Sequence, residues 1–380
     1  MFRSRTRLGV ITSAIVTASC HAPNRSPTDR LEPNVTHASE GDSGQVDAGA
    51  ASGQVRWVGR VDASRPEAVR FAWSGAGLTA VVGGAKVSAA IRTENTAMAV
   101  FFQPVIDGRP GPRFAVPPGP TRTVVLGEGL APGDHRVELY RETEGAHGVS
   151  VFEGFVEGSV RRAPPSPGRF IEIIGDSISA GYGNLGSEVH PPWKSQCSYS
   201  PETESVYMAY GSILARALQA DVSTIARSGW GMVRDFHGEK ANVLPDMYDN
   251  TLGAVATPPW EFRQQPDLVL IDLGSNDSAQ GDPGPPFEEA YIRFLHRVRG
   301  HYPSAWIFLV IGPVGAGPTL APMREHLRRI ATAMADPKVT TVDVPPQDMA
   351  RTGCDFHPDV AEDEAMAALL ARSIRARLGW

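Results

Sequence analysis

The chain has 380 residues, of which 42% are hydrophobic and 21% are charged, as in soluble globular proteins. This length is sufficient for two domains, each with its own hydrophobic core. The net charge of −6 at pH 7, without a basic stripe in the sequence, argues against a nucleic acid as the partner.

The first twenty residues are a candidate secretion signal. Three arginines precede an apolar stretch, residues 8–18, that is too short to span a bilayer as a mature helix. The stretch is followed by Cys20 in "TASC", which resembles the lipobox of a bacterial lipoprotein. Thr17 differs from the usual leucine-like residue, so lipidation of Cys20 and simple cleavage both stay open. We expect residues 1–20 to be a signal peptide and the protein to be exported to the periplasm, the cell surface or the medium.

The next two segments differ sharply in composition. Residues 21–53 are polar and nearly free of large apolar side chains, which predicts a disordered linker. Residues 54–162 contain short alternating runs such as "VRWVGRV", "LTAVVGG", "KVSAAI" and "HRVELYRET", separated by glycine and proline. Closely spaced strands with turn signals predict an antiparallel β-sandwich. Residues 163–169 are Pro-rich and are expected to link this sandwich to the following segment.

From residue 170 onward the pattern changes to strands that alternate with helices. Short buried runs predict strands, and amphipathic stretches between them predict helices. The strands are expected at residues 170–174, 222–226, 268–273, 306–311 and 339–344, and the helices at residues 205–220, 287–299, 323–334 and 362–378. Residues 170–380 are therefore predicted to form a three-layer α/β domain with a parallel sheet. The carboxyl ends of its first three strands are expected to meet at one crevice.

Ser177 follows the first of these strands, in "FIEIIGDSISAGYGN". Ligands bind at the carboxyl ends of strands in open α/β sheets, so this hydroxyl is well placed for chemistry, but a serine here also commonly caps a helix. The α/β-hydrolase motif Gly-x-Ser-x-Gly does not fit, because Ser179 occupies its fifth position. Other residues must therefore decide the role of Ser177.

Further polar features fall at the same edge of the predicted sheet. Gly229 and Gly231, in "SGWG", can bring backbone N–H groups close to a ligand, and Asn276 offers a side-chain donor. His357 lies in a loop ahead of the last helix. Taken singly, such glycines often only turn the chain, such an asparagine caps a helix and such a histidine is structural. With Ser177 they supply a nucleophile, a base and oxyanion donors, which are the parts that acyl transfer needs.

Other chemistries fit the sequence less well. The ten histidines do not have the spacing of a metal site, and neither a phosphate-binding loop nor a dinucleotide fingerprint occurs. We therefore expect no metal and no cofactor.

The blocks "GDSIS", "SGWG", "GSND" and "HP" resemble, in this order, those of the SGNH (GDSL-type) hydrolases. The finer resemblance is to carbohydrate esterase family two, and it includes "VGRVD", "TESVYMAYG" and "PPWEFRQQPDLVLIDLGSND". It implies an amino-terminal jelly-roll domain, a flavodoxin-like catalytic domain and acetyl esterase activity on polysaccharides such as xylan and glucomannan. It also implies Ser177 as nucleophile and His357 as base. The implied oxyanion donors are the N–H of Ser177, that of Gly229 or Gly231, and Asn276 Nδ2.

The histidine block departs from the wider superfamily, most of which carries Asp-x-x-His. Here Cys354 lies three residues before His357, and Asp355 only two before it. Family two resembles this arrangement, and some of its members orient the histidine with a backbone carbonyl. We therefore expect a Ser-His dyad, with Asp355 as an alternative orienting acid. Cys197 and Cys354 either form a disulfide that pins the histidine loop or stay unpaired, and both alternatives stay open.

Substrate contacts are expected from aromatic side chains that can stack on a sugar ring. Trp230, inside the glycine loop, is the first choice, whereas Trp260 and Trp193 either stack on sugar or pack loop ends. Asp176 is a further candidate contact. The polar loop after Ser177 offers no continuous apolar wall for a long acyl chain.

Two other functions stay open at this point. One is a deacylase of bacterial envelope glycans or a general short-chain esterase, and the other is a non-catalytic carbohydrate-binding lipoprotein. The presence of Ser177, Asn276 and His357 speaks against the binding protein, because it has no use for that combination.

Overall fold

The computed structural model describes residues 54–186, 188–189, 197–253, 259–313 and 317–380. The predicted signal peptide with Cys20, the predicted linker of residues 21–53, and Trp193 lie outside these described residues. Within the described part of the chain, no helix combines the length and the apolar character needed to cross a membrane.

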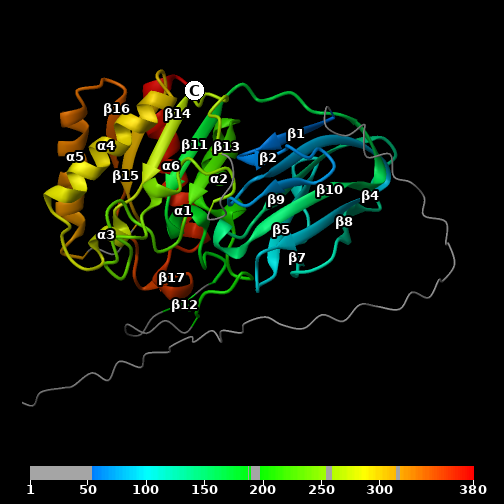
Figure 1. Cartoon of the computed structure of the whole chain (residues 1–380), viewed down its shortest axis with the longest axis horizontal. Coiled ribbons are helices and arrows are strands. Elements are labelled where there is room, and N and C mark those ends of the chain that lie inside the picture. Colours follow the sequence, from blue (N-terminus) through cyan, green and yellow to red (C-terminus); the bar gives the residue numbers. More distant parts are fainter. Residues whose placement is uncertain (1–53, 187, 190–196, 254–258, 314–316) are drawn as a thin grey trace, which may run out of the picture. The chain divides into compact units, whose positions relative to one another are not determined.

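The amino-terminal domain is an antiparallel β structure, as predicted (Figure 1). In its described residues the main strand order is β2-β3-β10-β4-β9-β5-β6, while β1 and β8 pair with β4 and β7 pairs with β5. The strands are β1 (Val55–Val58), β2 (Val61–Asp62), β3 (Val69–Phe71), β4 (Gly77–Glu94), β5 (Val100–Ile106), β6 (Arg109–Pro110), β7 (Phe114–Val116), β8 (Arg122–Glu128), β9 (Asp134–Arg141) and β10 (Val149–Arg162). A short 3-10 helix, Gly145–His147, connects β9 to β10.

One strand of this domain differs from the prediction. The runs "LTAVVGG" and "KVSAAI" belong to the single long strand β4, whose first half pairs with β9 and whose second half pairs with β8. Gly84 lies between the halves with φ +137°, a conformation that a residue with a side chain rarely adopts. The glycine lets the strand change direction without ending, so the apparent turn signal is an irregularity within one strand.

The carboxyl-terminal domain is a parallel sheet between two layers of helices, which confirms the predicted fold class (Figure 1). Its strands are β11 (Phe170–Gly175), β13 (Asp221–Ala226), β14 (Leu268–Asp272), β15 (Trp306–Ile311) and β16 (Val339–Asp343). Their spatial order, β13-β11-β14-β15-β16, is the flavodoxin-like order. All these strands run parallel, but the chain adds β13 on one side of β11 and then β14 on the other side. The carboxyl ends of β11, β13 and β14 therefore flank one crevice at this switch in strand order.

The helices and the remaining short elements follow this sheet in chain order. The helices are α1 (Ser177–Ala180), α2 (Tyr210–Leu218), α3 (Ser275–Ser278), α4 (Pro285–His301), α5 (Leu320–Met334) and α6 (Val360–Leu378). Short 3-10 helices are present at Val206–Met208, Leu244–Asp246 and Cys354–Phe356. The strands β12 (Glu188–Val189) and β17 (Arg351–Thr352) pair as a two-stranded antiparallel ribbon. Ile171 and Ile173 of β11 pack in the cluster formed with α2 and α6, whereas Ile174 belongs to the cluster formed with α4 and α5. Burial on both faces explains why the strand runs are continuously apolar.

The two domains share a hydrophobic core, because sandwich residues such as Trp73 and sheet residues such as Ile174 belong to one buried cluster. Glu172, in the middle of β11, pairs with Arg60 of the sandwich at 3.3 Å, and both side chains are 1% exposed. The same carboxylate accepts hydrogen bonds from the hydroxyls of Tyr248 (2.7 Å) and Tyr302 (2.9 Å). A buried charge needs such partners, so this cluster ties the sandwich to the parallel sheet.

Candidate active site

Ser177 lies at a sharp turn between β11 and α1. Asp176 caps the helix by accepting a hydrogen bond from Ile178 N at 3.1 Å. Gly175 precedes this cap, and a Cβ atom on it would lie 2.0 Å from Ser179 Oγ, so the turn requires glycine there. The result is a serine hydroxyl at the carboxyl end of a central strand, with only 7% of the residue exposed.

The structure places His357 directly against this serine. His357 Nε2 lies 2.8 Å from Ser177 Oγ, and His357 Nδ1 lies 3.1 Å from the main-chain oxygen of Asp355. A carbonyl oxygen can only accept, so Nδ1 carries the hydrogen and Nε2 is free to accept the serine proton. Burial lowers the pKa of His357 below its usual value of 6.5, which favours the neutral form that a general base needs.

The Asp355 carboxylate is engaged on the other side of the loop. Its Oδ2 atom accepts hydrogen bonds from Tyr182 OH (2.9 Å) and from Tyr199 N (2.8 Å). Asp355 and Phe356 both have left-handed backbones, with φ of 51° and 63°. This turn presents the Asp355 carbonyl, rather than its carboxylate, to the imidazole, in line with the expected dyad.

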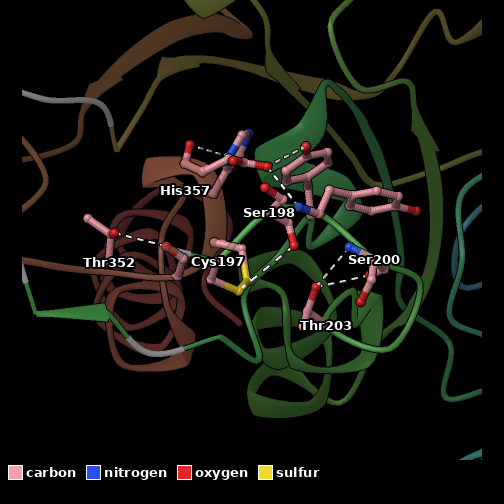
Figure 2. Close-up of a disulfide and its surroundings, with 11 residues drawn as sticks. Cys197, Ser198, Ser200, Thr203, Thr352 and His357 are labelled. Atoms are coloured by element: carbon pink, nitrogen blue, oxygen red, sulfur yellow. Dashed lines mark hydrogen bonds between the residues drawn. A yellow bond between two sulfur atoms is a disulfide. The ribbon is translucent and has the colours of Figure 1, made fainter. Parts of the chain in front are cut away.

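A disulfide supports the same loop. Cys197 and Cys354 are bonded, with their Cα atoms 4.7 Å apart, which decides between the two alternatives left by the sequence (Figure 2). Asp355 N also donates to the Cys197 carbonyl at 3.0 Å, and Cys354 N donates to the Gly183 carbonyl at 2.9 Å. The histidine loop is thereby joined to the segments that follow the nucleophile turn.

The candidate oxyanion donors do not all reach the site. Gly229 and Asn276 line a cavity of about 790 Å³ together with Ser177 and His357. Gly231 does not line this cavity; it lies against Asp277, whose Oδ2 would be 2.3 Å from a Cβ atom on the glycine. The expectation that either glycine can serve is therefore corrected in favour of Gly229.

The side-chain amide of Asn276 already has two hydrogen-bond acceptors within the protein, which the sequence does not indicate. Its Nδ2 donates to Asp176 Oδ2 and to the Trp230 carbonyl, both at 3.1 Å. Donation to an oxyanion therefore requires that one of these acceptors share or release the amide. Both bonds hold the side chain in one orientation at the cavity wall.

Asp176 is not a substrate contact, because the residue is completely buried. Its Oδ2 accepts from Ser275 Oγ as well as from Asn276, and burial raises the pKa of Asp176 to about 6. The buried Asp176 carboxylate thus orients the Asn276 side chain through this hydrogen bond and does not itself face the cavity. Ser275 was missed in the sequence, although its position beside Asn276 in "GSND" is a usable signal.

Two family models match the chain. The carbohydrate esterase 2 N-terminal model matches residues 57–167, and the GDSL-like lipase/acylhydrolase model matches residues 173–365. A solved structure of a family two carbohydrate esterase from Clostridium thermocellum, in complex with cellohexaose, is 35% identical with a TM-score of 0.80. It is matched over 99% of its own chain and 86% of this one. The chain belongs to carbohydrate esterase family two.

Curated relatives of this family-two chain point the same way. It is 36% identical over 336 residues to the cellulase/esterase CelE of Acetivibrio thermocellus, which covers 86% of this chain and 40% of that protein. It is 26% identical over 342 residues to an acetylxylan esterase / glucomannan deacetylase of Cellvibrio japonicus, which covers 87% of this chain and 91% of that protein. The chain thus spans less than half the length of the first relative and nearly all of the second.

The two described tryptophan candidates of the family-two site have different positions. Trp230 lines the cavity, and the Arg227 guanidinium lies 5.5 Å from its ring centre. Trp260 does not line the cavity; it packs near Arg60, whose guanidinium lies 5.7 Å from its ring centre. The expectation for Trp260 is corrected, because the chain folds its loop onto the Arg60 cluster between the domains.

Several residues of the family-two site were missed from the sequence. The Tyr182 ring packs in a tilted arrangement against His357 with ring centres 4.2 Å apart, and the aromatic residue in "GYGN" just after the nucleophile is a usable signal. Asp277 accepts hydrogen bonds from Met232 N and Val233 N at 2.8 Å, so it braces the glycine loop from behind. This role depends on a contact across 44 or more residues and has no local signal.

The cavity is also more apolar than the loop sequence predicts. Apolar side chains from later segments line it, namely Trp230, Phe236, Met349 and Phe356, and Phe236 is 53% exposed. The prediction of a site without an apolar wall is therefore wrong for the described cavity, and residues 187 and 190–196 of the loop after Ser177 lie outside the described residues. Aromatic faces suit sugar rings as well as acyl chains, so acyl-chain length becomes the discriminating test.

Proposed function

We propose that this chain is a serine esterase that removes O-acetyl groups from a polysaccharide of the xylan or glucomannan type. The observation that carries the proposal is the 2.8 Å contact of Ser177 Oγ with His357 Nε2 at the wall of a cavity of about 790 Å³. Membership of carbohydrate esterase family two supports the reaction class.

In the proposed reaction, His357 Nε2 takes the proton of Ser177 while Oγ attacks the acetyl carbonyl carbon. The oxyanion receives hydrogen bonds from the N–H groups of Ser177 and Gly229 and from Asn276 Nδ2. The bond between the carbonyl carbon and the sugar oxygen then breaks, His357 gives its proton to that oxygen, and an acetyl group stays on Ser177. Water attacks this ester while His357 takes one of its protons, and His357 returns that proton to Ser177 Oγ as the acyl bond breaks, so that acetate and free Ser177 result. Loss of one oxyanion donor typically costs about 2.7–4 kcal/mol of transition-state stabilisation.

The substrate class is supported by relatives and by the cavity wall. The Cellvibrio japonicus relative is named an acetylxylan esterase / glucomannan deacetylase, and the solved Clostridium thermocellum relative holds cellohexaose. Trp230 offers this chain an aromatic face beside the reacting serine, on which a sugar ring can stack. An acetyl group needs only a small recess next to Ser177.

We further propose that the protein acts outside the cytoplasm, held by a lipid on Cys20 or released after cleavage. The arginines and the apolar stretch before Cys20 support export, and a disulfide between Cys197 and Cys354 is typical of oxidising compartments. Palmitate labelling of the full chain expressed in a bacterium, with Cys20→Ser as control, tests the anchor. Export of the chain without palmitate labelling would favour simple cleavage of the signal over a lipid anchor on Cys20.

The experiment for the activity measures acetate released by the purified chain from acetylated xylan and acetylated glucomannan, with Ser177→Ala as control. Release by the wild type that is lost in the variant supports the proposal. A parallel series of aryl acetate, butyrate and octanoate esters is expected to show a steep fall with chain length. If octanoate esters are cleaved as fast as acetate esters, the proposal of a carbohydrate esterase would give way to that of a general esterase. Binding of the polymer without any hydrolysis would indicate a binding protein.

A further inference from the structure

The backbone just before the candidate oxyanion glycine is held by a side chain of the other domain. Ser228 N donates to Glu144 Oε2 at 2.8 Å, and Ser228 immediately precedes Gly229. Glu144 belongs to the connection between β9 and β10 of the sandwich, 84 residues earlier in the chain. The residue is 3% exposed, so its bond to Ser228 is shielded from water.

The connection that carries Glu144 is itself firmly held. Arg141, which is completely buried, donates from its guanidinium to the carbonyls of Thr143 (2.7 Å), Glu144 (3.0 Å) and His147 (3.1 Å). A further nitrogen of the same guanidinium donates to Ser150 Oγ at 2.6 Å. One planar group therefore organises the whole turn, and the Glu144 carboxylate projects from a fixed base.

A second chain of contacts connects Glu144 to the histidine side of the site. Glu144 N donates to Glu204 Oε1 at 3.2 Å, and Glu204 Oε2 accepts from Tyr199 OH at 2.8 Å. The Tyr199 ring stacks on Tyr182 with centres 4.4 Å apart, and Tyr182 packs at a tilt against His357. Glu144 thus contacts the glycine loop with its carboxylate and the supports of the histidine with its backbone.

The sandwich domain contacts the backbone of the site but does not line its cavity. The described residues that line the cavity all lie between Ser177 and Pro358, in the α/β domain. We infer that Glu144 is a positioning residue, which holds Ser228 so that the Gly229 N–H is directed at the developing oxyanion. This inference rests on the proposed esterase function. It gives the sandwich domain a part in the chemical step as well as in stability.

The size of the effect follows from how strictly such donors must be placed. A hydrogen bond from a backbone N–H to a carboxylate is charge-assisted and about twice as strong as a neutral one. Misplacement of a catalytic group by about 1 Å can cost about 10²-fold in rate. A Glu144 variant that cannot reach Ser228 is therefore expected to lower kcat for a small ester by up to about 10²-fold.

The test uses the full chain with Glu144→Asp, Glu144→Gln and Glu144→Ala, assayed for kcat and KM on 4-nitrophenyl acetate. Aspartate keeps the charge but is too short to reach Ser228, whereas glutamine keeps the reach and offers an amide oxygen as acceptor. Glu138→Gln is the matched control. Glu138 is a carboxylate of β9 with a side chain 13% exposed, and it accepts from Tyr140 OH at 2.6 Å within its own domain.

We expect Glu144→Asp and Glu144→Ala to lose kcat with KM nearly unchanged, and Glu144→Gln to recover most of the loss. Glu138→Gln is expected to keep the wild-type kcat even where its Tm falls. Wild-type kcat in Glu144→Asp, or an equal loss of kcat in Glu138→Gln, would overturn the inference. If Glu144→Ala does not fold, the aspartate and glutamine variants decide. An inactive wild type would refute the proposed function instead, so the two failures are distinct.

Discussion

The Nδ1 atom of His357 lies 3.1 Å from the main-chain carbonyl oxygen of Asp355, two residues earlier in the chain. The carbonyl selects the tautomer that leaves Nε2 facing Ser177 Oγ. It carries only a partial negative charge, so it stabilises the imidazolium less than a carboxylate would. The task of orienting the base therefore falls to the backbone of the loop and to the contacts that hold that loop.

Asp355→Asn is expected to lower kcat only modestly. The carbonyl that orients His357 is unchanged, and asparagine tolerates the left-handed backbone of this position, φ 51°. Loss of a true triad carboxylate lowers kcat by about 10⁴-fold. Steady-state kinetics on an aryl acetate decide the matter, because a loss of that size would identify the Asp355 side chain as the orienting acid.

Ser177→Ala and His357→Ala are each expected to lower kcat by about 10⁴-fold or more, with the fold intact. The two residues act as one unit, so the double variant is expected to be hardly less active than either single variant. Kinetics on an aryl acetate, with circular dichroism as the folding control, measure both effects. Near-normal turnover in either single variant would remove that residue from the dyad.

The pH profile of kcat/KM is expected to rise with a midpoint below 6.5. Burial disfavours the charged imidazolium and so lowers the pKa of His357, while the negative charges of Asp355 and Glu144 oppose this shift without reversing it. Because the neutral imidazole is the base, activity is lost only as the pH falls through that lowered pKa. A midpoint above the usual value of 6.5 in the free enzyme would contradict this sign.

Cys197→Ser is expected to lower both stability and kcat. Its disulfide with Cys354 closes a long loop, and loss of a native disulfide typically costs about 2–5 kcal/mol. The bond also joins the histidine loop to the segment that carries Tyr199, so kcat is expected to fall with it. Thermal unfolding and kinetics are measured with and without a reducing agent. The reducing agent should lower Tm and kcat of the wild type and leave both unchanged in Cys197→Ser. An equal decrease in both proteins would refute the role of the disulfide.

Trp230→Ala is expected to reduce turnover of an acetylated polymer more than that of a small aryl acetate. Aromatic stacking contributes about 0.5–1.5 kcal/mol, and the leaving group of an aryl acetate does not depend on it. Trp260→Ala is the matched control, because Trp260 packs near Arg60 outside the cavity. The ratio of the two activities is the readout, and a ratio unchanged in Trp230→Ala would exclude sugar stacking on this residue.

Much of the fold could be predicted from local patterns. The strand that ends at Gly175 is apolar throughout because both its faces are covered, and the amphipathic period of α2 reports that one face is buried. Such patterns are contained in windows of five to twenty residues, so a single sequence is enough to read them. Ser177, Asn276 and His357 could be found for a related reason, since the carboxyl ends of parallel strands meet at one edge of a sheet.

Only the tertiary structure decided which of several equivalent-looking residues reach the site. Gly229 and Gly231 are alike in sequence, but the buried Asp277 lies against only one of them. Asp355 could orient His357 by its carboxylate or its carbonyl, and the left-handed turn selects the carbonyl. Glu144 has no local signal at all, because its contact with Ser228 depends on how the two domains pack. Periodicity encodes which face of an element is buried, whereas the partner of a buried polar group is set by chain segments far apart in the sequence.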